Sequence, residues 1–169
     1  MTKQRKSHHI SGRDFERIIL GDHETLSFEI RLNSSFDACF ANAVMAWPKG
    51  HDPDHPTDDW LIAIRDGVSH ALGLPVSLYN CKDLPIDILH STDLLIVSWQ
   101  TRSFITVDLT LDEAGDSKAD VKFLYRHYKR TKEIDRFCDL VAIFLKENQN
   151  RITPEMMALV DKKILPKGN

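Results

Sequence analysis

The sequence is poor in cysteine and glycine, and each shortage argues against a class of protein or site. Its 169 residues include 3 Cys and 7 Gly. Cys39, Cys81 and Cys138 are isolated, which argues against a disulfide framework or a cysteine zinc site and predicts reduced thiols in a cytoplasmic protein. With so few glycines a nucleotide-cradling loop is hard to build, and neither a Walker loop nor a Gly-x-Ser-x-Gly motif is present.

Long hydrophobic runs are also missing. The longest unbroken apolar run, Leu140–Leu145, covers six residues, whereas about 18–20 are needed to cross a bilayer. The basic residues near the start of the chain are followed by no apolar stretch. We therefore expect neither a membrane partner nor a secretory signal.

What the sequence does contain is typical of one globular domain. Hydrophobic residues make up 42% and charged residues 28%, and the length favours a single domain over residues 11–169 after a flexible tail over residues 1–10. The net charge of −3 hides an asymmetry: residues 1–117 carry −8 and residues 118–169 carry +5. Such a division can place metal-binding acids beside an anionic polymer, or it can be two solvated faces that attract each other.

Apolar periodicity predicts the elements. A period of two indicates a strand over 26–32, and a further strand is expected over 74–79. β-Branched and aromatic residues indicate strands over 93–99 and 103–111, which a short polar link joins as a hairpin. A helical period indicates helices over 11–20 (with Phe15, Ile18 and Ile19 inward), 34–47, 57–72, 119–129 and 133–147, and a last one opened by Pro154. Residues 83–90 fit either state. The expected fold class is α/β (α+β), a small mixed sheet with a central hairpin, covered by helices.

The hairpin carries two acids that can meet. Asp93 begins its first strand and Asp108 lies near the end of the second. Adjacent antiparallel strands can bring such residues to one end of a sheet. Two carboxylates there would suit Mg²⁺, which takes few carboxylates and keeps several waters, and a lysine nearby could stabilise charge on a phosphate.

This hairpin resembles the core of the PD-(D/E)XK nucleases, in which an acidic residue is followed on the next strand by Asp or Glu, any residue, and Lys. Asp93 matches the first acid and the segment 107–110 matches the second element, with Thr110 where the family has its lysine. The resemblance implies a restriction-endonuclease-like core that hydrolyses phosphodiesters with Mg²⁺ or Mn²⁺, and we expect DNA rather than RNA as the polymer.

The resemblance also implies further residues. Because the family lysine has migrated in some members, Lys118, ahead of Lys122, is the candidate to replace it. Glu16 on the first predicted helix is the counterpart of a helical glutamate that often joins the two carboxylates at the metal. The implied catalytic residues are thus Asp93, Asp108 and Lys118, and the implied metal ligands are Asp93, Asp108 and Glu16.

A basic stripe follows the hairpin. On the helix expected over 119–129 and just beyond it, Lys122, Arg126, Lys129 and Arg130 share one side and form a candidate nucleic-acid-binding surface. A solvated basic helix face is an equal alternative.

A third cluster, within residues 51–59, contains two His and four Asp, which could ligate Zn²⁺ or Mn²⁺. Pro53 and Pro56 prevent the helix on which the His-x-x-x-His spacing works best, and Asp58 and Asp59 suit a helix start. We therefore favour an exposed loop with incidental ligands.

Two hypotheses of different class result. The leading one is a metal-dependent, nuclease-like protein, an endonuclease or exonuclease or a degenerate member that binds nucleic acid without cutting it. The alternative is a small non-catalytic interaction protein, an accessory or immunity-type factor that uses its acidic and basic faces to bind a protein. A homodimer is compatible with both.

Overall fold

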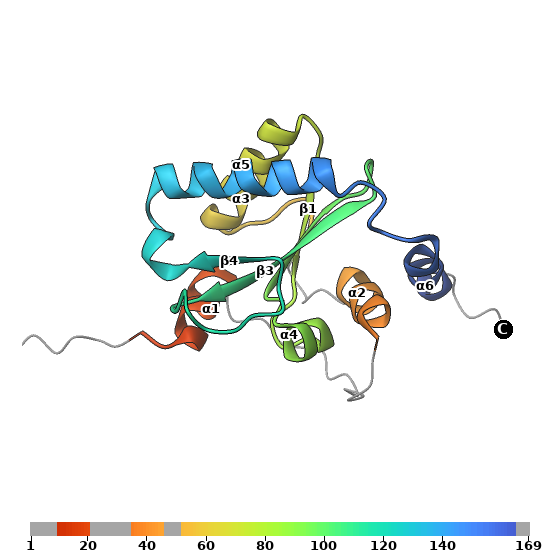
Figure 1. Ribbon diagram of the computed structural model, residues 1–169, viewed down its shortest axis with the longest axis horizontal. Coiled ribbons are helices and arrows are strands. Elements are labelled where there is room, and N and C mark those ends of the chain that lie inside the picture. Colours follow the sequence, from red (N-terminus) through yellow and green to blue (C-terminus); the bar gives the residue numbers. More distant parts are fainter. Residues whose placement is uncertain (1–9, 21–34, 46–51, 165–169) are drawn as a thin grey trace, which may run out of the picture.

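The computed structural model describes residues 10–20, 35–45 and 52–164, in which helices cover a four-stranded sheet (Figure 1). The helices are α1 (Gly12–Leu20), α2 (Phe36–Met45), α3 (Asp59–Leu72), α4 (Pro85–His90), α5 (Thr131–Glu147) and α6 (Pro154–Ile164), with a 3₁₀ turn η1 (Tyr125–His127). The strands are β1 (Ser77–Asn80), β2 (Leu94–Ser98), β3 (Ser103–Thr110) and β4 (Val121–Leu124).

The sheet is mixed and has the order β1-β2-β3-β4. β1, β2 and β3 are antiparallel neighbours, whereas β4 is parallel to β3. The predicted hairpin is β2–β3, which closes with Ser98 opposite Ser103. The fold class is therefore α+β with a central hairpin, as predicted.

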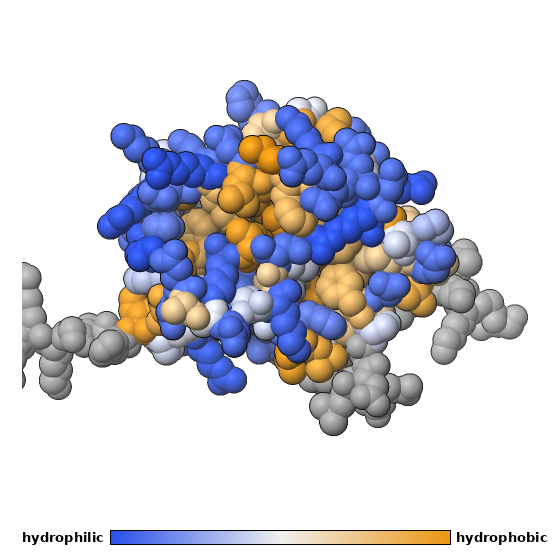
Figure 2. Space-filling view, viewed as in Figure 1, coloured by the Kyte–Doolittle hydropathy of each residue, from blue (hydrophilic) through white to orange (hydrophobic). Residues whose placement is uncertain are grey.

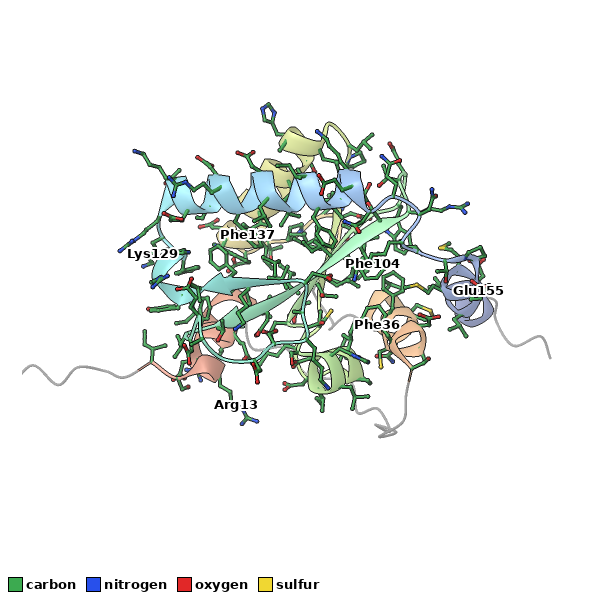
Figure 3. All side chains as sticks on the ribbon, in the orientation of Figure 1. Arg13, Phe36, Phe104, Lys129, Phe137 and Glu155 are labelled. Atoms are coloured by element: carbon green, nitrogen blue, oxygen red, sulfur yellow. The ribbon has the colours of Figure 1, made fainter. Side chains whose placement is uncertain are left out.

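Each face of the sheet has its own core. Leu94 and Ile96 of β2 pack into a cluster with α1, α3 and α5, while the alternate residues Leu95 and Val97 pack with α2, α4 and α6. Figure 3 shows Phe137 between α5 and the strands, and Phe36 and Phe104 together on the other side, where their rings stack with centroids 5.6 Å apart. A sheet buried on both faces explains why β2 is apolar throughout.

Helix ends follow the expected signals. Asp58 accepts hydrogen bonds from the backbone N–H groups of Trp60 and Leu61 at the start of α3, and Gly73 ends that helix with φ 75°. Ser11 and Asp14 cap α1 reciprocally, and Pro154 is the first residue of α6. These short-range signals set most helix boundaries.

Two expectations about secondary structure and packing are wrong. Residues 119–129 form β4 and η1 instead of a helix, because the free edge of β3 offers backbone hydrogen bonds to an alternating segment, with Val107 opposite Val121. Ile18 is 41% exposed, while Phe15 and Ile19 are buried. The open choice over 83–90 is settled as α4, which Pro85 begins.

Some expectations lie outside the described residues: the strand over 26–32, the ends of the helix over 34–47, His51 and all of the tail but Ile10. Within the described ranges, no helix has the length and apolar character needed to span a membrane.

Candidate functional site

Asp93 is held at the junction of three strands. Its backbone N–H donates to the carbonyl of Val107 at 2.9 Å, and its carbonyl accepts from the N–H of Cys81 at 2.8 Å. Its Oδ2 accepts from the N–H of Leu109 at 2.7 Å. The residue is only 3% exposed, so its carboxyl group has a fixed position at the buried end of the sheet.

Asp108 lies on the same face of the sheet as Asp93. Leu95 of β2 is paired with Thr106 of β3, and side chains alternate along each strand. Asp93 is two residues before Leu95, and Asp108 is two residues after Thr106. Both side chains therefore point to the face that α4 covers. The two acids of the hairpin thus share one face at the same end of the sheet.

Glu16 joins this end of the sheet from α1. The amide of Asn80, at the end of β1, donates to the carbonyl of Leu20 at 3.2 Å and so fixes the last turn of α1 against the sheet. Glu16 is partly buried, and the charge of Asp108 is among those that act on it. The helical glutamate and the two hairpin acids thus share one electrostatic environment.

Sequence reasoning missed Asp87. This residue is in the first turn of α4, and its Oδ2 accepts from the N–H of Asp83 at 2.8 Å. Its carboxylate also accepts a hydrogen bond from the carboxyl group of Asp93. The signal that could have found it is the Leu84-Pro85 helix start, since the first turn of a helix favours an acid.

Four acids form the carboxylate cluster at this end of the sheet (Glu16, Asp87, Asp93 and Asp108), and the pKa values of Glu16, Asp87 and Asp93 are raised. Burial and then the charge of Asp87 raise the pKa of Asp93 far above its ordinary value of 3.8. Burial also raises the pKa of Asp87, and burial together with the charge of Asp87 raises the pKa of Glu16 to about 6. Without a cation, Asp93 is therefore protonated at neutral pH and donates to Asp87.

The donor set of the cluster fits a hard divalent cation. Carboxylate oxygens are the ligands of Mg²⁺, which needs only one or two of them and fills its other positions with water and substrate phosphate. Nowhere in the described residues do three or more His, Cys, Asp or Glu side chains stand together as a ready-made metal group. Two carboxylates such as those of Asp93 and Asp108 match the small number that Mg²⁺ takes from a protein.

Lys82, directly after β1, is a lysine whose charge acts on this group of acids. Its charge lowers the pKa of Glu16, against the effect of burial. The two lysines that the sequence suggested are engaged elsewhere: Lys118 donates to the carbonyl of Leu89 at 3.1 Å, and Lys122 donates to the carbonyls of Glu113 and Gly115. Sequence reasoning missed Lys82 because its nearness to Glu16 depends on where α1 packs.

The predicted basic stripe does not form on a helix. Lys122 lies on β4, Arg126 on η1, and Lys129 and Arg130 follow. Arg126 is paired with Glu113 at 2.7 Å, and Lys122 donates to the carbonyl of the same residue. Two of the four basic side chains are therefore bonded to the loop before β4. Lys129 and Arg130 are exposed.

The cluster over residues 51–59 serves its own loop in the part that the structure describes. His55 Nδ1 is 3.2 Å from Asp52 Oδ2. Asp54 accepts a hydrogen bond from Ser77, and Asp58 caps α3. These contacts support the interpretation of an exposed loop with incidental ligands.

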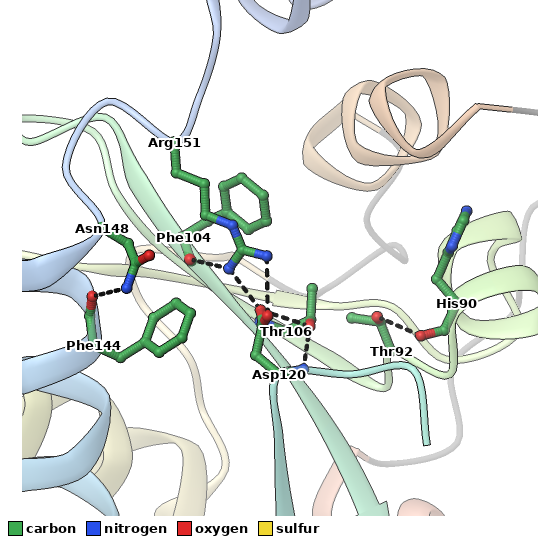
Figure 4. A network of polar contacts seen from close by, with 8 residues as sticks. All are labelled: His90, Thr92, Phe104, Thr106, Asp120, Phe144, Asn148 and Arg151. Atoms are coloured by element: carbon green, nitrogen blue, oxygen red, sulfur yellow. Dashed lines mark hydrogen bonds and ion pairs between the residues drawn. The ribbon is translucent and has the colours of Figure 1, made fainter. Parts of the chain in front are cut away.

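A second polar network braces the strand that carries Asp108 (Figure 4). Arg151 makes two hydrogen bonds to the carboxylate of Asp120, at 2.7 and 2.9 Å, and a third to the carbonyl of Phe104. Asp120 in turn accepts from the N–H and hydroxyl of Thr106. The guanidinium also lies 4.1 Å from the centre of the Phe104 ring. This network ties the segment before β4 and the α5–α6 connection to β3.

Comparisons with known proteins give no match, either to a family model, to a curated protein or to a solved structure. The function is therefore argued from the site alone.

Proposed function

We propose that this protein is a metal-dependent, nuclease-like hydrolase of nucleic acid phosphodiesters, with DNA as the preferred polymer. The observation that carries the proposal is the convergence of Glu16 from α1 with Asp93 and Asp108 of the β2–β3 hairpin. These elements are the ones from which the PD-(D/E)XK pattern draws its acids, and the three residues are far apart in the sequence.

Asp93 and Asp108 would hold Mg²⁺ or Mn²⁺, with Glu16 beside them. A divalent cation there would offset the burial and the neighbouring negative charge that raise the pKa values of Glu16 and Asp93. When bound, such an ion polarises a phosphodiester oxygen and lowers the pKa of a water molecule. Asp87 and the N–H of Leu109 orient the carboxyl group of Asp93.

Lys82 takes the role that the resemblance gives to a lysine at position 110. Thr110 cannot supply a positive charge, whereas Lys82 already acts on Glu16 at this edge of the sheet. Its ammonium group would stabilise the charge that develops on the phosphate during displacement. Lys129 and Arg130, which are exposed, would hold the backbone of the polymer.

A cleavage assay tests this function directly. Supercoiled plasmid and single-stranded DNA are incubated with the protein in Mg²⁺ or Mn²⁺, and cut products are followed on gels. We expect Asp108→Asn to reduce the rate at least about 100-fold, because a ligand and its charge are lost. The matched control is Asp116→Asn, an exposed acid on the loop after β3, which should cut as the wild type does.

Two results would contradict the nuclease. Equal cleavage by wild type and Asp108→Asn would assign the activity to a contaminant or to another site. No cleavage of any DNA or RNA substrate with either metal would leave the second candidate, a non-catalytic interaction protein.

One observation favours that second candidate. Lys122 and Arg126 are bonded to the loop that contains Glu113, so part of the basic surface is neutralised within the chain. Binding to nucleic acid that is absent, or that does not weaken with salt, would support a protein partner instead.

A further inference from the structure

The outer side of α5 carries apolar residues that no other part of the described ranges (10–20, 35–45 and 52–164) covers. Leu140 is 50% exposed and Ile143 is 55% exposed. They lie opposite the side of α5 that packs against the core through Phe137, Val141 and Leu145. Figure 2, in which α5 lies in front, shows hydrophobic surface near the middle of this helix with hydrophilic surface at both ends.

The same side of the helix carries opposite charges at its two ends. Arg136, Leu140, Ile143 and Glu147 follow one another at steps of four, three and four, which places them on one stripe of an α-helix. Arg136 and Glu147 are both exposed. The stripe is thus positive, apolar, apolar and negative in order.

This order is complementary to itself when it is reversed. If two copies of α5 run antiparallel about a two-fold axis midway between Leu140 and Ile143, each leucine lies opposite the isoleucine of the other copy. The same axis places each Arg136 opposite Glu147 of the other copy, because both residues lie four positions outside the apolar pair. A two-fold contact requires a surface that matches itself in this way.

We propose that the α5 stripe (Arg136, Leu140, Ile143 and Glu147) is the contact surface of a homodimer with antiparallel α5 helices. The proposal is independent of the nuclease. Arg136 gives up little in forming the contact, since its pair with Glu133 is 3.4 Å long and the arginine side chain is 76% exposed. One helix pair buries less than a standard interface, so the dimer is weak and depends on concentration.

Sedimentation velocity over a concentration series from the micromolar to the millimolar range tests the contact. Wild type should shift from monomer to dimer. Arg136→Glu places two acids opposite each other at both ends of the contact, and Glu147→Arg places two arginines there, so each variant alone should remain monomeric. Asp161→Arg, on an exposed position of α6, is the matched charge control and should dimerise as the wild type does.

Combining the two substitutions tests the charge pairing and the orientation of the helices. Between an Arg136→Glu chain and a Glu147→Arg chain, both end contacts again join an acid to an arginine, so an equimolar mixture should form dimers. The chain with both substitutions should also dimerise. In a parallel pair residue 136 meets residue 136, so wild type and the doubly substituted chain would each bring like charges together and only the mixture would dimerise. Dimers of wild type and of the double variant therefore identify the antiparallel contact.

Three outcomes overturn the proposal. The first is a wild type that stays monomeric at every concentration, and the second is a dimer that both charge reversals leave intact. The third is two monomeric variants that stay apart when mixed. Leu140→Gln, at a half-exposed position, provides a variant whose fold the substitution does not threaten, and it should weaken dimerisation at least about tenfold.

Discussion

Asp93 is an ionisable residue whose burial disfavours its charged form. Its side chain is almost fully buried and Asp87 lies beside it, so its pKa is raised well above 3.8. Between the pKa of the unfolded chain and this raised value, the native state binds more protons than the unfolded state. The free energy of unfolding that Asp93 contributes therefore falls as pH rises through neutrality.

We expect Asp93→Asn to stabilise the fold at about pH 8, by about 1–2 kcal/mol. The amide keeps the shape of the side chain, can accept from Leu109 and can donate to Asp87. It also removes the ionisation that favours the unfolded chain of the wild type above the ordinary pKa of an aspartate. Near pH 4 and below the difference should shrink, because the carboxyl group then becomes protonated in the unfolded chain as well. Urea unfolding at several pH values measures this, with Asp116→Asn as the control. Equal stability of Asp93→Asn and wild type at pH 8 would show that Asp93 is not held in its neutral form.

Gly67 is a second residue whose identity the packing requires. A Cβ atom at this position would lie 2.6 Å from Sγ of Cys138, where α3 and α5 cross. We expect Gly67→Ala to destabilise the protein by about 1–3 kcal/mol, because a buried contact is overpacked. Adding Cys138→Ala should recover part of this loss by removing the sulfur. Thermal unfolding of the two single variants and the double variant measures the coupling, and simple additivity would contradict the close contact.

At the scale of elements, Arg151 and Asp120 add a side-chain link between the segment before β4, the α5–α6 connection and β3. The pair is partly buried, with 30% of the arginine side chain and 18% of the aspartate side chain exposed. Burial alone would raise the pKa of Asp120, but the bonds from Arg151 and Thr106 hold it below its ordinary value. The pair is thus an internal brace of the sheet.

Removing one partner should cost more than removing both. Arg151→Met leaves Asp120 without its main partner, and we expect a loss of about 2–3 kcal/mol of unfolding free energy. Asp120→Asn combined with Arg151→Met should cost less than the sum of the two single substitutions. A double-mutant cycle by urea unfolding measures the difference, and an additive result would show that the two side chains act independently.

The elements differ in how far the sequence predicted them. Most of the helices and the hairpin were recognisable because their signals are local: Asp58 and Gly73 mark the ends of α3, and Pro154 opens α6. Residues 119–129 were wrongly predicted as a helix. The apolar residues there fit a helical period, but the segment pairs with the edge of β3, a contact that no local pattern contains.

At the scale of the whole molecule, the candidate site depends on contacts between distant segments. The hairpin itself could be predicted, with Asp93 and Asp108 at one end of it, but their shared face depends on the register in which β2 pairs with β3. The nearness of Lys82 and Asp87 could not be predicted, because it follows from the packing of α1 and α4 on that end of the sheet. Glu16 was predicted from a resemblance alone, and its position is fixed by the contact of Asn80 with Leu20.

The carboxylate cluster should make the stability of the whole protein depend on divalent cations. A ligand that binds the native state alone raises the unfolding temperature, and Mg²⁺ needs ionised carboxylates. We expect millimolar Mg²⁺ or Mn²⁺ to raise the unfolding temperature of wild type by a few degrees. The effect should grow as pH rises from about 6 to 9, because fewer protons then compete with the metal.

Variants separate binding of the cation from the chemistry that follows. Asp108→Asn and Asp93→Asn should lose the shift in unfolding temperature, and Asp116→Asn should keep it. Lys82→Met should also keep the shift, because a positive charge is not a metal ligand, yet it should lose DNA cleavage. If Mg²⁺ raises the unfolding temperature of Asp108→Asn as much as that of wild type, the cation binds elsewhere. If no variant and no pH shows a shift, the acids at this end of the sheet hold no metal, and the nuclease loses its main support.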